Sequence, residues 1–504
     1  MPSSQRLPSR PGARWSLPPL EYRWVVVIVY VFALFMEFLD ATIINVALPT
    51  IATDFGVSPT DIEWVTTAYL LSLAVFIPVS GWAGDRFGSK RTFVVALALF
   101  TFGSALCGLA WNVESLVGFR ILQGMGGGLL APVGAAMVYR AFPPDQRARV
   151  SSIVTIPTVV GPTSGPVLGG YLVEYQTWHW VFLINVPVGL LGLVIAARGL
   201  REHREAGAGR LDLAGFALSA TGLAAVIYAL AEAGPRGFTD GRVMTAGLGG
   251  LAALAAFVAV ELRVADPLID VRLFRDRLFA ACNAVLFFNQ AVFVGLIFLL
   301  PILLQAERGL SPFGAGLATF PTALGVVMVA PLTARLYAAV GPRRLLFAGM
   351  VMIVLAALAL RRIGPDTGVW EIRALMLPIG WGFGLTLVPL QAASFARIST
   401  AATGRASAAF GVTRQVAGSF GVALLATVLS GRLADRGASL GDPRTSGAAV
   451  AAFGDAFAVA ALVGLVGVGV ALLVSDRLAA GSRGLPEPSR PAATVPTPAD
   501  LAAD

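Results

Sequence analysis

The chain has 504 residues, of which 56% are hydrophobic and 13% are charged, and its net charge is +8. A soluble protein has about 25% charged residues, so this composition excludes a set of ordinary water-exposed domains. Apolar runs of about 20 residues, the length that crosses a bilayer, recur along the chain. The sequence therefore predicts an all-α polytopic membrane protein.

Residue types that carry enzymatic or cofactor chemistry are scarce. The two cysteines, Cys107 and Cys282, lie inside apolar runs, and His179 and His203 are far apart in sequence. This pattern offers no disulfide framework and no metal-ligand spacing. The sequence also lacks a G-x-x-x-x-G-K-[ST] loop, so ATP is not the expected energy source. We expect no cofactor, no metal and no enzymatic activity.

In chain order, a polar N-terminal tail is followed by fourteen predicted spans and a tail rich in proline, alanine and serine. The first apolar run is too long for a signal-peptide core. Residue 212 is predicted to begin a helix, because an aspartate there precedes an apolar run. The predicted spans are 24–48, 61–84, 92–111, 115–139, 149–172, 178–197, 211–232, 243–262, 278–304, 312–336, 345–362, 374–396, 406–430 and 452–474.

The positions of the basic residues predict the orientation. If the N-terminus lies inside, 26 lysines and arginines fall in inner segments and nine in outer segments. Because cytoplasmic loops carry an excess of lysine and arginine, both termini are predicted to be cytoplasmic. The basic charge is thus interpreted as a topology signal, and no nucleic-acid partner is expected. The expected location is a bacterial cytoplasmic (inner) membrane, crossed many times.

Two loops resemble each other and suggest an internal repeat. GWAGDRFGSKR (81–91) joins the second and third spans, and PLTARLYAAVGPRRL (331–345) joins the tenth and eleventh. Repeated halves around a midplane site are a common transporter architecture. The predicted parts are a cytoplasmic tail (1–23), an N-terminal six-helix bundle (24–197), a linker with two inserted transmembrane helices (198–264), a C-terminal six-helix bundle (265–475) and a disordered cytoplasmic tail (476–504).

The first span carries two acidic residues near its middle. Glu37 and Asp40 are three positions apart, which places them on one face of a helix. A carboxylate at this depth is costly and marks an ion pathway, and two close carboxylates repel, so at least one is expected to hold a proton near neutral pH. A structural pair neutralised by an arginine is the alternative. Arg120, in the fourth span at a comparable depth, could supply that arginine or take part in proton exchange.

Two glycine-containing segments are expected to shape helix contacts. The loop at 81–91 has the pattern G-x-x-x-D-R-x-G-x-K-R, in which glycines permit close approach and the basic residues hold the loop inside. The segment GPTSGPVLGG (161–170) places glycines every four residues, so one helix face can approach a neighbouring backbone closely. A generic packing seam is the alternative for the second segment. The residues of both segments are Gly81, Asp85, Arg86, Gly88, Lys90, Arg91, Gly161, Pro162, Gly165, Pro166, Gly169 and Gly170.

Other polar and aromatic residues fall near mid-membrane and are candidates for a substrate cavity. The alternatives, which the residues alone leave open, are that the polar residues tie helices together and that the phenylalanine faces lipid. These candidates are Gln123 in the fourth span, Phe287, Asn289 and Gln290 in the ninth, and Arg414 and Gln415 in the thirteenth.

Four motifs in this order resemble those of one transporter family. LDATIINVALP (39–49), the loop at 81–91, R-x-x-Q-G from residue 120 and the segment at 161–170 are similar to motifs of the fourteen-helix drug:proton antiporters of the major facilitator superfamily. The resemblance implies two six-helix bundles plus two inserted helices. It also implies proton-coupled efflux of small amphipathic compounds by alternating access, with Glu37, Asp40 and Arg120 in proton coupling.

Several alternatives remain open at this point. The same fold could carry an uncoupled or differently coupled facilitator or exporter of a lipid or metabolite, because fold does not fix function. A membrane sensor is disfavoured because no soluble domain is visible in the sequence. The expected partners are a small-molecule substrate, protons and membrane lipids, and the chain is expected to work as a monomer.

Overall fold

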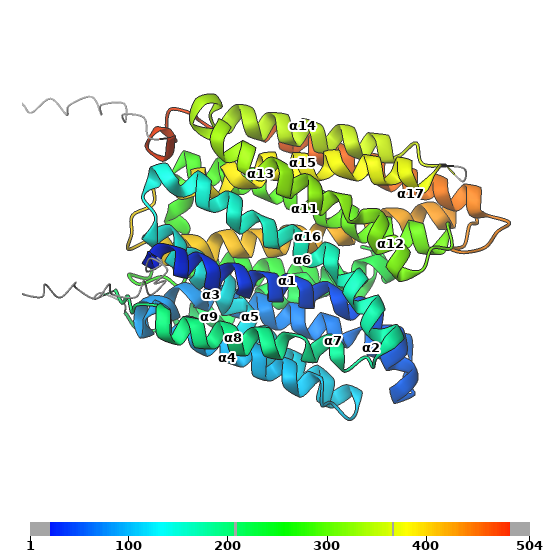
Figure 1. Ribbon diagram of the computed structural model, residues 1–504, viewed down its shortest axis with the longest axis horizontal. Coiled ribbons are helices and arrows are strands. Elements are labelled where there is room, and N and C mark those ends of the chain that lie inside the picture. Colours follow the sequence, from blue (N-terminus) through cyan, green and yellow to red (C-terminus); the bar gives the residue numbers. More distant parts are fainter. Residues whose placement is uncertain (1–20, 206–208, 365–366, 484–504) are drawn as a thin grey trace, which may run out of the picture.

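The computed structural model describes residues 21–205, 209–364 and 367–483, and these residues form helices and loops without a β-strand (Figure 1). The N-terminal helices are α1 (Tyr22–Phe55), α2 (Pro59–Ile62), α3 (Trp64–Phe87), α4 (Ser89–Cys107), α5 (Val113–Ala141), η1 (Pro144–Gln146), α6 (Arg147–Tyr175), α7 (Trp180–Leu183) and α8 (Asn185–Gly199). The inserted pair is α9 (Leu213–Arg236) and α10 (Gly241–Glu261). The C-terminal helices are η2 (Val271–Arg275), α11 (Arg277–Ala306), α12 (Pro312–Thr319), α13 (Pro321–Val340), α14 (Pro342–Leu360), α15 (Val369–Ser394), α16 (Thr403–Asp435), α17 (Ser446–Ala471) and η3 (Ala480–Arg483).

Within the described residues, thirteen helical segments are long and apolar enough to cross a membrane. Two of them, Trp180–Gly199 and Pro312–Val340, are interrupted helices. The other long helix is α6, with 29 residues, whose apolar run is diluted by glycine, proline, serine and threonine. It packs along α1 and α13. Because of this position we count it as a membrane span as well, the fifth in chain order, which brings the total to fourteen. The predicted all-helical membrane fold is confirmed.

Some helices extend beyond their predicted ends. The first span was predicted to end at residue 48, yet α1 continues through Pro49 to Phe55. A proline removes one backbone donor and bends a helix without having to end it when neighbours cover the loosened turn. The helix ends at Gly56, whose φ of 65° is left-handed, as is common at helix C-termini. Asp212 accepts a hydrogen bond from the Gly215 amide at the start of α9, which confirms its predicted place.

The long helices form two bundles. Helices α1, α3, α4, α5, α6 and α8 pack largely on one another, and so do α11 to α17. Figure 1 shows α4 and α8 at one outer side of the molecule and α14 at the other. The fold thus matches the predicted two six-helix bundles with an inserted pair. Helix α1 begins at the same end of the molecule at which η3 lies (Figure 1). Helix η1, which follows Arg140, contacts η3, and Arg140 bonds Asp85 and Ser89, the neighbours of Arg86 and Lys90. We therefore call this the basic end.

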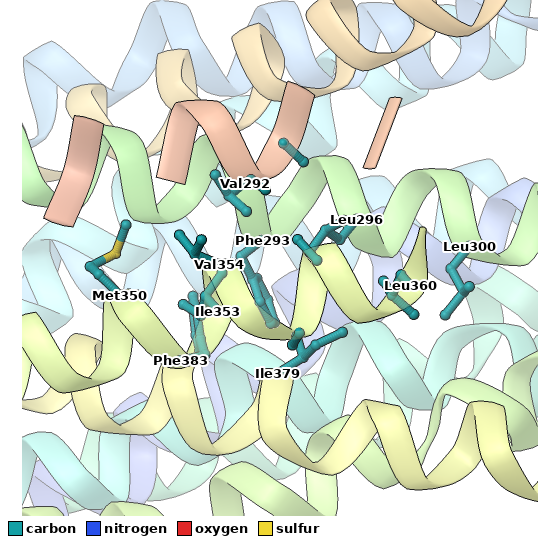
Figure 2. Close-up of a cluster of buried hydrophobic side chains, with 14 of the residues drawn as sticks. Val292, Phe293, Leu296, Leu300, Met350, Ile353, Val354, Leu360, Ile379 and Phe383 are labelled. Carbon is teal, nitrogen blue, oxygen red and sulfur yellow. The ribbon is translucent and has the colours of Figure 1, made fainter. Parts of the chain in front are cut away.

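Packing of apolar side chains holds the C-terminal bundle together (Figure 2). The rings of Phe293 on α11 and Phe383 on α15 stack with centroids 3.7 Å apart, and Ile353 of α14 is fully buried in the same cluster. Lipid tails are as apolar as these side chains, so close van der Waals packing rather than exclusion from water stabilises this contact. The bundle is therefore a closely packed unit.

The inserted helix α9 lies in the seam between α3 and α16, one helix from each bundle. Leu223 and Ile227 of α9 are buried against Ala74 of α3, with Val412 and Val416 of α16 beside them. The second inserted helix, α10, packs on α9. Its side chains Leu248 and Leu251 are 64% and 59% exposed, as expected for a helix that faces lipid.

The predicted internal repeat has a structural counterpart at the basic end. Gly88 and Gly341 begin α4 and α14 with φ of 100° and 89°, a conformation that favours glycine. A carboxylate covers each turn: Glu202 accepts hydrogen bonds from the Lys90 and Arg91 amides, and Asp476 accepts one from the Arg343 amide. In both bundles, a segment that follows the last helix caps the third helix.

The predicted tails lie mainly outside the described residues. One part differs from the prediction: residues 480–483, expected to lie in a disordered tail, form η3 and pack against α13. The Ser482 and Tyr337 hydroxyls lie 2.7 Å apart, and Arg483 donates to the Ala338 carbonyl. Composition alone did not reveal this contact because it depends on side chains from a distant helix.

Candidate functional site

A cavity lies between the two bundles, toward the basic end. The empty space between its lining residues, including space open to solvent, is about 540 Å³. Helices α1, α3, α5 and α6 supply one wall, and α15 and α16 supply the other. Its lining residues are Tyr30, Leu34, Glu37, Ile77, Gly127, Ala131, Pro132, Ala135, Tyr139, Val154, Thr158, Gln391, Phe395, Ser407, Phe410, Gly411 and Arg414. The site is mainly apolar and aromatic with a few polar groups, as is usual for small-molecule sites.

The cavity contains one acidic and one basic side chain, and they come from different bundles. Glu37 of α1 is 4% exposed, and its Oε1 lies 3.8 Å from a guanidinium nitrogen of Arg414 on α16. Its Oε2 is buried without a hydrogen-bond partner. The Arg414 guanidinium also lies over the Phe38 ring, 4.9 Å from its centre. The ion pair is thus loose, and Glu37 keeps one carboxylate oxygen available.

Asp40 lies in a different environment, fully buried within the N-terminal bundle. Its Oδ2 accepts a 2.5 Å hydrogen bond from Arg120. Its Oδ1 accepts hydrogen bonds from Gln123 at 2.8 Å and from Asn185 at 2.9 Å. The Arg120 guanidinium also lies 4.1 Å from the centre of the Tyr69 ring. The structure therefore places Arg120 on Asp40 and separates this cluster from the lining of the cavity, although Glu37 is only one helical turn away.

The glycines of α6 contact the segment of α1 that carries both carboxylates. A Cβ added at Gly161 would lie 2.8 Å from the Phe38 Cβ, and one at Gly165 would lie 2.2 Å from the Thr42 Oγ1. A Cβ at Gly169 would lie 2.8 Å from the Ile43 carbonyl oxygen. Only residues without a side chain permit this approach of the two helices.

On its other side, α6 meets the C-terminal bundle. Gly170 lies near Phe313 of α12, and a Cβ added at Gly316 of α12 would lie 3.2 Å from the Pro166 Cβ. Pro162, on the same helix, is half-buried. Helix α6 therefore connects the carboxylate-bearing part of α1 to the opposite bundle.

At the basic end, the segment 81–91, which forms the end of α3, the Gly88 turn and the start of α4 rather than a long loop, contacts both bundles. Asp85 accepts a 2.8 Å hydrogen bond from Arg140, and Arg140 also donates to the Thr400 carbonyl beyond α15. A Cβ at Gly81 would lie 3.0 Å from the Gly404 carbonyl carbon of α16. Three further residues of the loop, Arg86, Lys90 and Arg91, lie toward the surface, and Lys90 is half-buried.

Aromatic and polar contacts close the cavity at the same end. The rings of Tyr139 and Phe395 stack with centroids 4.3 Å apart, and the Tyr139 hydroxyl lies 3.2 Å from Gln391 Oε1. Arg147 donates to the Phe395 carbonyl. Each of these contacts joins the N-terminal bundle to the C-terminal bundle, so the two bundles are in direct contact at the basic end.

The structure describes all six residues predicted for the substrate cavity, and Arg414 lines it while the other five do not. Gln123 belongs to the Asp40 cluster. Asn289 donates to Thr386 at 2.7 Å inside the C-terminal bundle, and Gln290 is buried with an unpartnered oxygen. Phe287 and Gln415 are half-buried, and the Phe287 ring contacts the Phe420 ring.

Several residues of this site were not singled out from the sequence. Arg140 and Arg147 lie between the predicted spans 115–139 and 149–172, among the basic residues of an inner segment, and Tyr139 and Gln391 carry no distinguishing sequence pattern. Asn185 is a polar residue in an apolar run, which is the signal that could have identified it. Arginine at the end of a span offers no such signal, because positive-inside loops contain many.

Two bundles of membrane-crossing helices around a central cavity are an arrangement found in many secondary transporters. Residues 30–422 match the sequence model of the Major Facilitator Superfamily, and the chain belongs to this family of transporters.

Relatives with curated names include the multidrug resistance protein B homolog of Mycobacterium tuberculosis (strain ATCC 25618 / H37Rv). It is 36% identical, and the match covers 80% of this chain and 75% of that protein. The putative multidrug resistance protein MdtD of Klebsiella pneumoniae (strain 342) is 39% identical over 73% of this chain and 75% of its own length.

Solved structures show the same fold. The human organic anion transporter MFSD10 (TETRAN) superposes with a TM-score of 0.63 at 16% identity, covering 90% of this chain and 100% of that one. The proton:xylose symporter XylE superposes with a TM-score of 0.60 at 14% identity, covering 88% and 94%. At this identity the likeness concerns the arrangement of helices.

Proposed function

We propose that this chain exports small amphipathic compounds, drugs among them, in exchange for protons across the cytoplasmic membrane of a bacterium. The names of its relatives, which are multidrug resistance proteins, support the substrate class. The basic end then faces the cytoplasm, in agreement with the excess of arginine there. The two bundles, taken as residues 24–197 and 265–475, are the units that rock about the cavity.

The observation that carries this proposal is the position of Glu37. It is a nearly fully buried carboxylate that lines the cavity between the two bundles of membrane-crossing helices, with one oxygen unpartnered. Such a group is costly to keep in a membrane unless it binds and releases an ion. We assign proton exchange to Glu37, which the substrate can reach, and we assign to Asp40 and Arg120 the task of holding α1 in place beside it.

The conformational parts follow from their contacts between bundles. Gly81 of α3 packs against Gly404 of α16, and Arg140 donates to the Thr400 carbonyl, so these two contacts hold the cytoplasmic end closed. Asp85 holds Arg140 in place from within the N-terminal bundle. Opening this end requires these contacts to break. The contacts of Gly161, Gly165 and Gly169 of α6 with α1 persist, because both helices belong to the N-terminal bundle. Protonation of Glu37 weakens its attraction to Arg414 across the bundles, which couples proton binding to the relative motion of the two units.

Purified full-length chain in proteoliposomes tests the proposal with a panel of cationic, neutral and zwitterionic fluorescent dyes. An imposed pH gradient should accelerate dye movement in the wild type, and a protonophore should abolish the acceleration. E37Q should lose the response to the gradient, whereas R436Q, which removes a surface ion pair with Asp455, should keep it. Dye movement that is the same with and without the gradient would instead favour an uncoupled facilitator.

A further inference from the structure

The charges inside the cavity are balanced. Among its lining residues, Glu37 is the acidic side chain and Arg414 is the basic one. The remaining polar groups are hydroxyls and one amide, supplied by Tyr30, Tyr139, Thr158, Gln391 and Ser407. A ligand therefore meets one negative and one positive group in an otherwise apolar and aromatic chamber.

The two charges satisfy each other only in part. Their closest nitrogen and oxygen are 3.8 Å apart, beyond the usual length of a charged hydrogen bond, and Glu37 Oε2 has no partner. By contrast, Asp40 binds Arg120 at 2.5 Å and also has two amide donors. The cavity pair is thus available to a ligand, and the Asp40 pair is not.

The pair also spans the two bundles, with Glu37 on α1 and Arg414 on α16. A cationic ligand that binds Glu37 draws it away from Arg414 and leaves a buried guanidinium without a counter-ion. An anionic ligand does the converse to Glu37. Leaving one partner of a buried pair uncompensated is strongly unfavourable, so a ligand that supplies both charges avoids this cost.

We propose that the cavity receives amphipathic zwitterions. The cationic group binds Glu37, the anionic group binds Arg414, and an aromatic body lies against Tyr30, Tyr139 and Phe410. This inference rests on the proposed function in taking the cavity as the substrate site. A free drug-like molecule and the head group of a zwitterionic phospholipid share this chemistry.

Binding to the purified full-length chain, measured by equilibrium dialysis at one pH without a gradient, tests the inference. The probes form one series: an aryl-piperazine carboxylic acid, its methyl ester (cationic), its N-acetyl derivative (anionic) and the doubly blocked neutral compound. The zwitterion is expected to bind about tenfold more tightly than the ester or the acetylated acid, the effect of one additional charged contact.

Two variants assign each charge to its partner. E37Q should remove the preference for the zwitterion over the acetylated acid, and R414Q should remove the preference over the ester. R414K keeps the charge and should retain part of that preference, which separates lost recognition from lost folding. R436Q, whose pair with Asp455 lies outside the cavity lining, should bind the series as the wild type does.

A wild-type chain that binds the ester as tightly as the zwitterion overturns the inference and leaves proton-coupled export standing. Preference for the zwitterion without any response of transport to a pH gradient has the opposite meaning: the substrate class holds and the coupling fails. Lysophosphatidylethanolamine added as a competitor distinguishes the source. If the lysolipid competes with the zwitterion in the wild type and not in E37Q, the natural ligand is a lipid head group. If the lysolipid does not compete in the wild type, the natural ligand is a free small molecule.

Discussion

Two carboxylates one helical turn apart have different surroundings in this protein, and this difference decides their roles. Asp40 accepts hydrogen bonds from Arg120, Gln123 and Asn185 and is fully buried. Glu37 faces the cavity and keeps an unpartnered oxygen. A carboxylate whose two oxygens both accept hydrogen bonds from neighbouring helices holds those helices together. A carboxylate with an unpartnered oxygen can exchange one binding partner for another.

This division predicts the effects of two substitutions on stability. D40N leaves Arg120 buried without a counter-ion, and removal of one partner from a buried pair costs about 3–5 kcal/mol. The double variant D40N/R120Q should recover part of this loss. Thermal unfolding of the purified protein measures both. D455N, in an exposed pair, is the control and should cost at most about 1 kcal/mol; an unchanged melting temperature for D40N would contradict the structural role of Asp40.

At this scale, part of the site could be predicted from the sequence. Arg120 and Asp40 were expected at the same depth, and they form a salt bridge. The sequence could not show that Asn185 completes this cluster, or that Glu37 instead meets Arg414. The spacing of Glu37 and Asp40 predicts that they lie on one face of α1. Which of the two is buried within the bundle, and which lines the cavity, depends on the neighbouring helices.

At the scale of elements, α6 is the helix that links the carboxylates to the rest of the molecule. Gly165 faces Thr42 of α1, and Pro166 faces α12 of the other bundle. The glycine and proline content that weakens α6 as an isolated helix thus serves its contacts on two sides. The sequence predicted this seam because glycines every four residues line one face.

We expect G165A to be poorly tolerated, because the new Cβ would lie 2.2 Å from Thr42 Oγ1. Overpacking of this kind costs about 1–3 kcal/mol and should also slow transport by shifting α1. G118A is the matched control, because nothing lies within 4 Å of a Cβ at that position. Dye efflux and thermal unfolding, measured side by side, check the prediction. Equal behaviour of the two variants would refute the role of the seam.

The loops show where sequence reasoning stops at this scale. The similarity between residues 81–91 and 331–345 indicated the repeat, and both loops have a glycine with positive φ. The caps by Glu202 and Asp476 were not predicted, because a capping side chain distant in sequence leaves no local pattern. The second loop lacks the aspartate of the first, so the two copies are alike in backbone and different in charge.

At the scale of the whole molecule, the two bundles contact each other at the basic end, and α9 packs between α3 of one bundle and α16 of the other. Length and apolar content predicted fourteen spans, and the similarity between residues 81–91 and 331–345 predicted the inserted pair. They could not predict that α9 contacts both bundles, because its apolar side chains suit lipid and protein equally. Relative motion of the bundles must therefore change at least one face of α9.

Weakening the closed end should expose the cavity from that side. Arg140 bonds Asp85 and the Thr400 carbonyl, so R140Q removes contacts within and between bundles. Loss of about 1–2 kcal/mol of closing free energy changes a population by about five- to thirtyfold. Thiol labelling of S407C, a cavity position, should accelerate accordingly in R140Q. The native Cys107 and Cys282 are buried. An unchanged labelling rate would show that Arg140 does not hold this end closed.

The most direct test of the central claim is proton release on substrate binding. Purified protein in weakly buffered solution receives a transported dye, and a pH indicator follows the protons. At a pH low enough for protons to occupy Glu37 in the free protein, the wild type and R436Q should release protons as the dye binds, because the dye and the proton compete for this carboxylate. E37Q should bind dye without releasing protons. Release from E37Q equal to that from the wild type would contradict the assignment of proton exchange to Glu37.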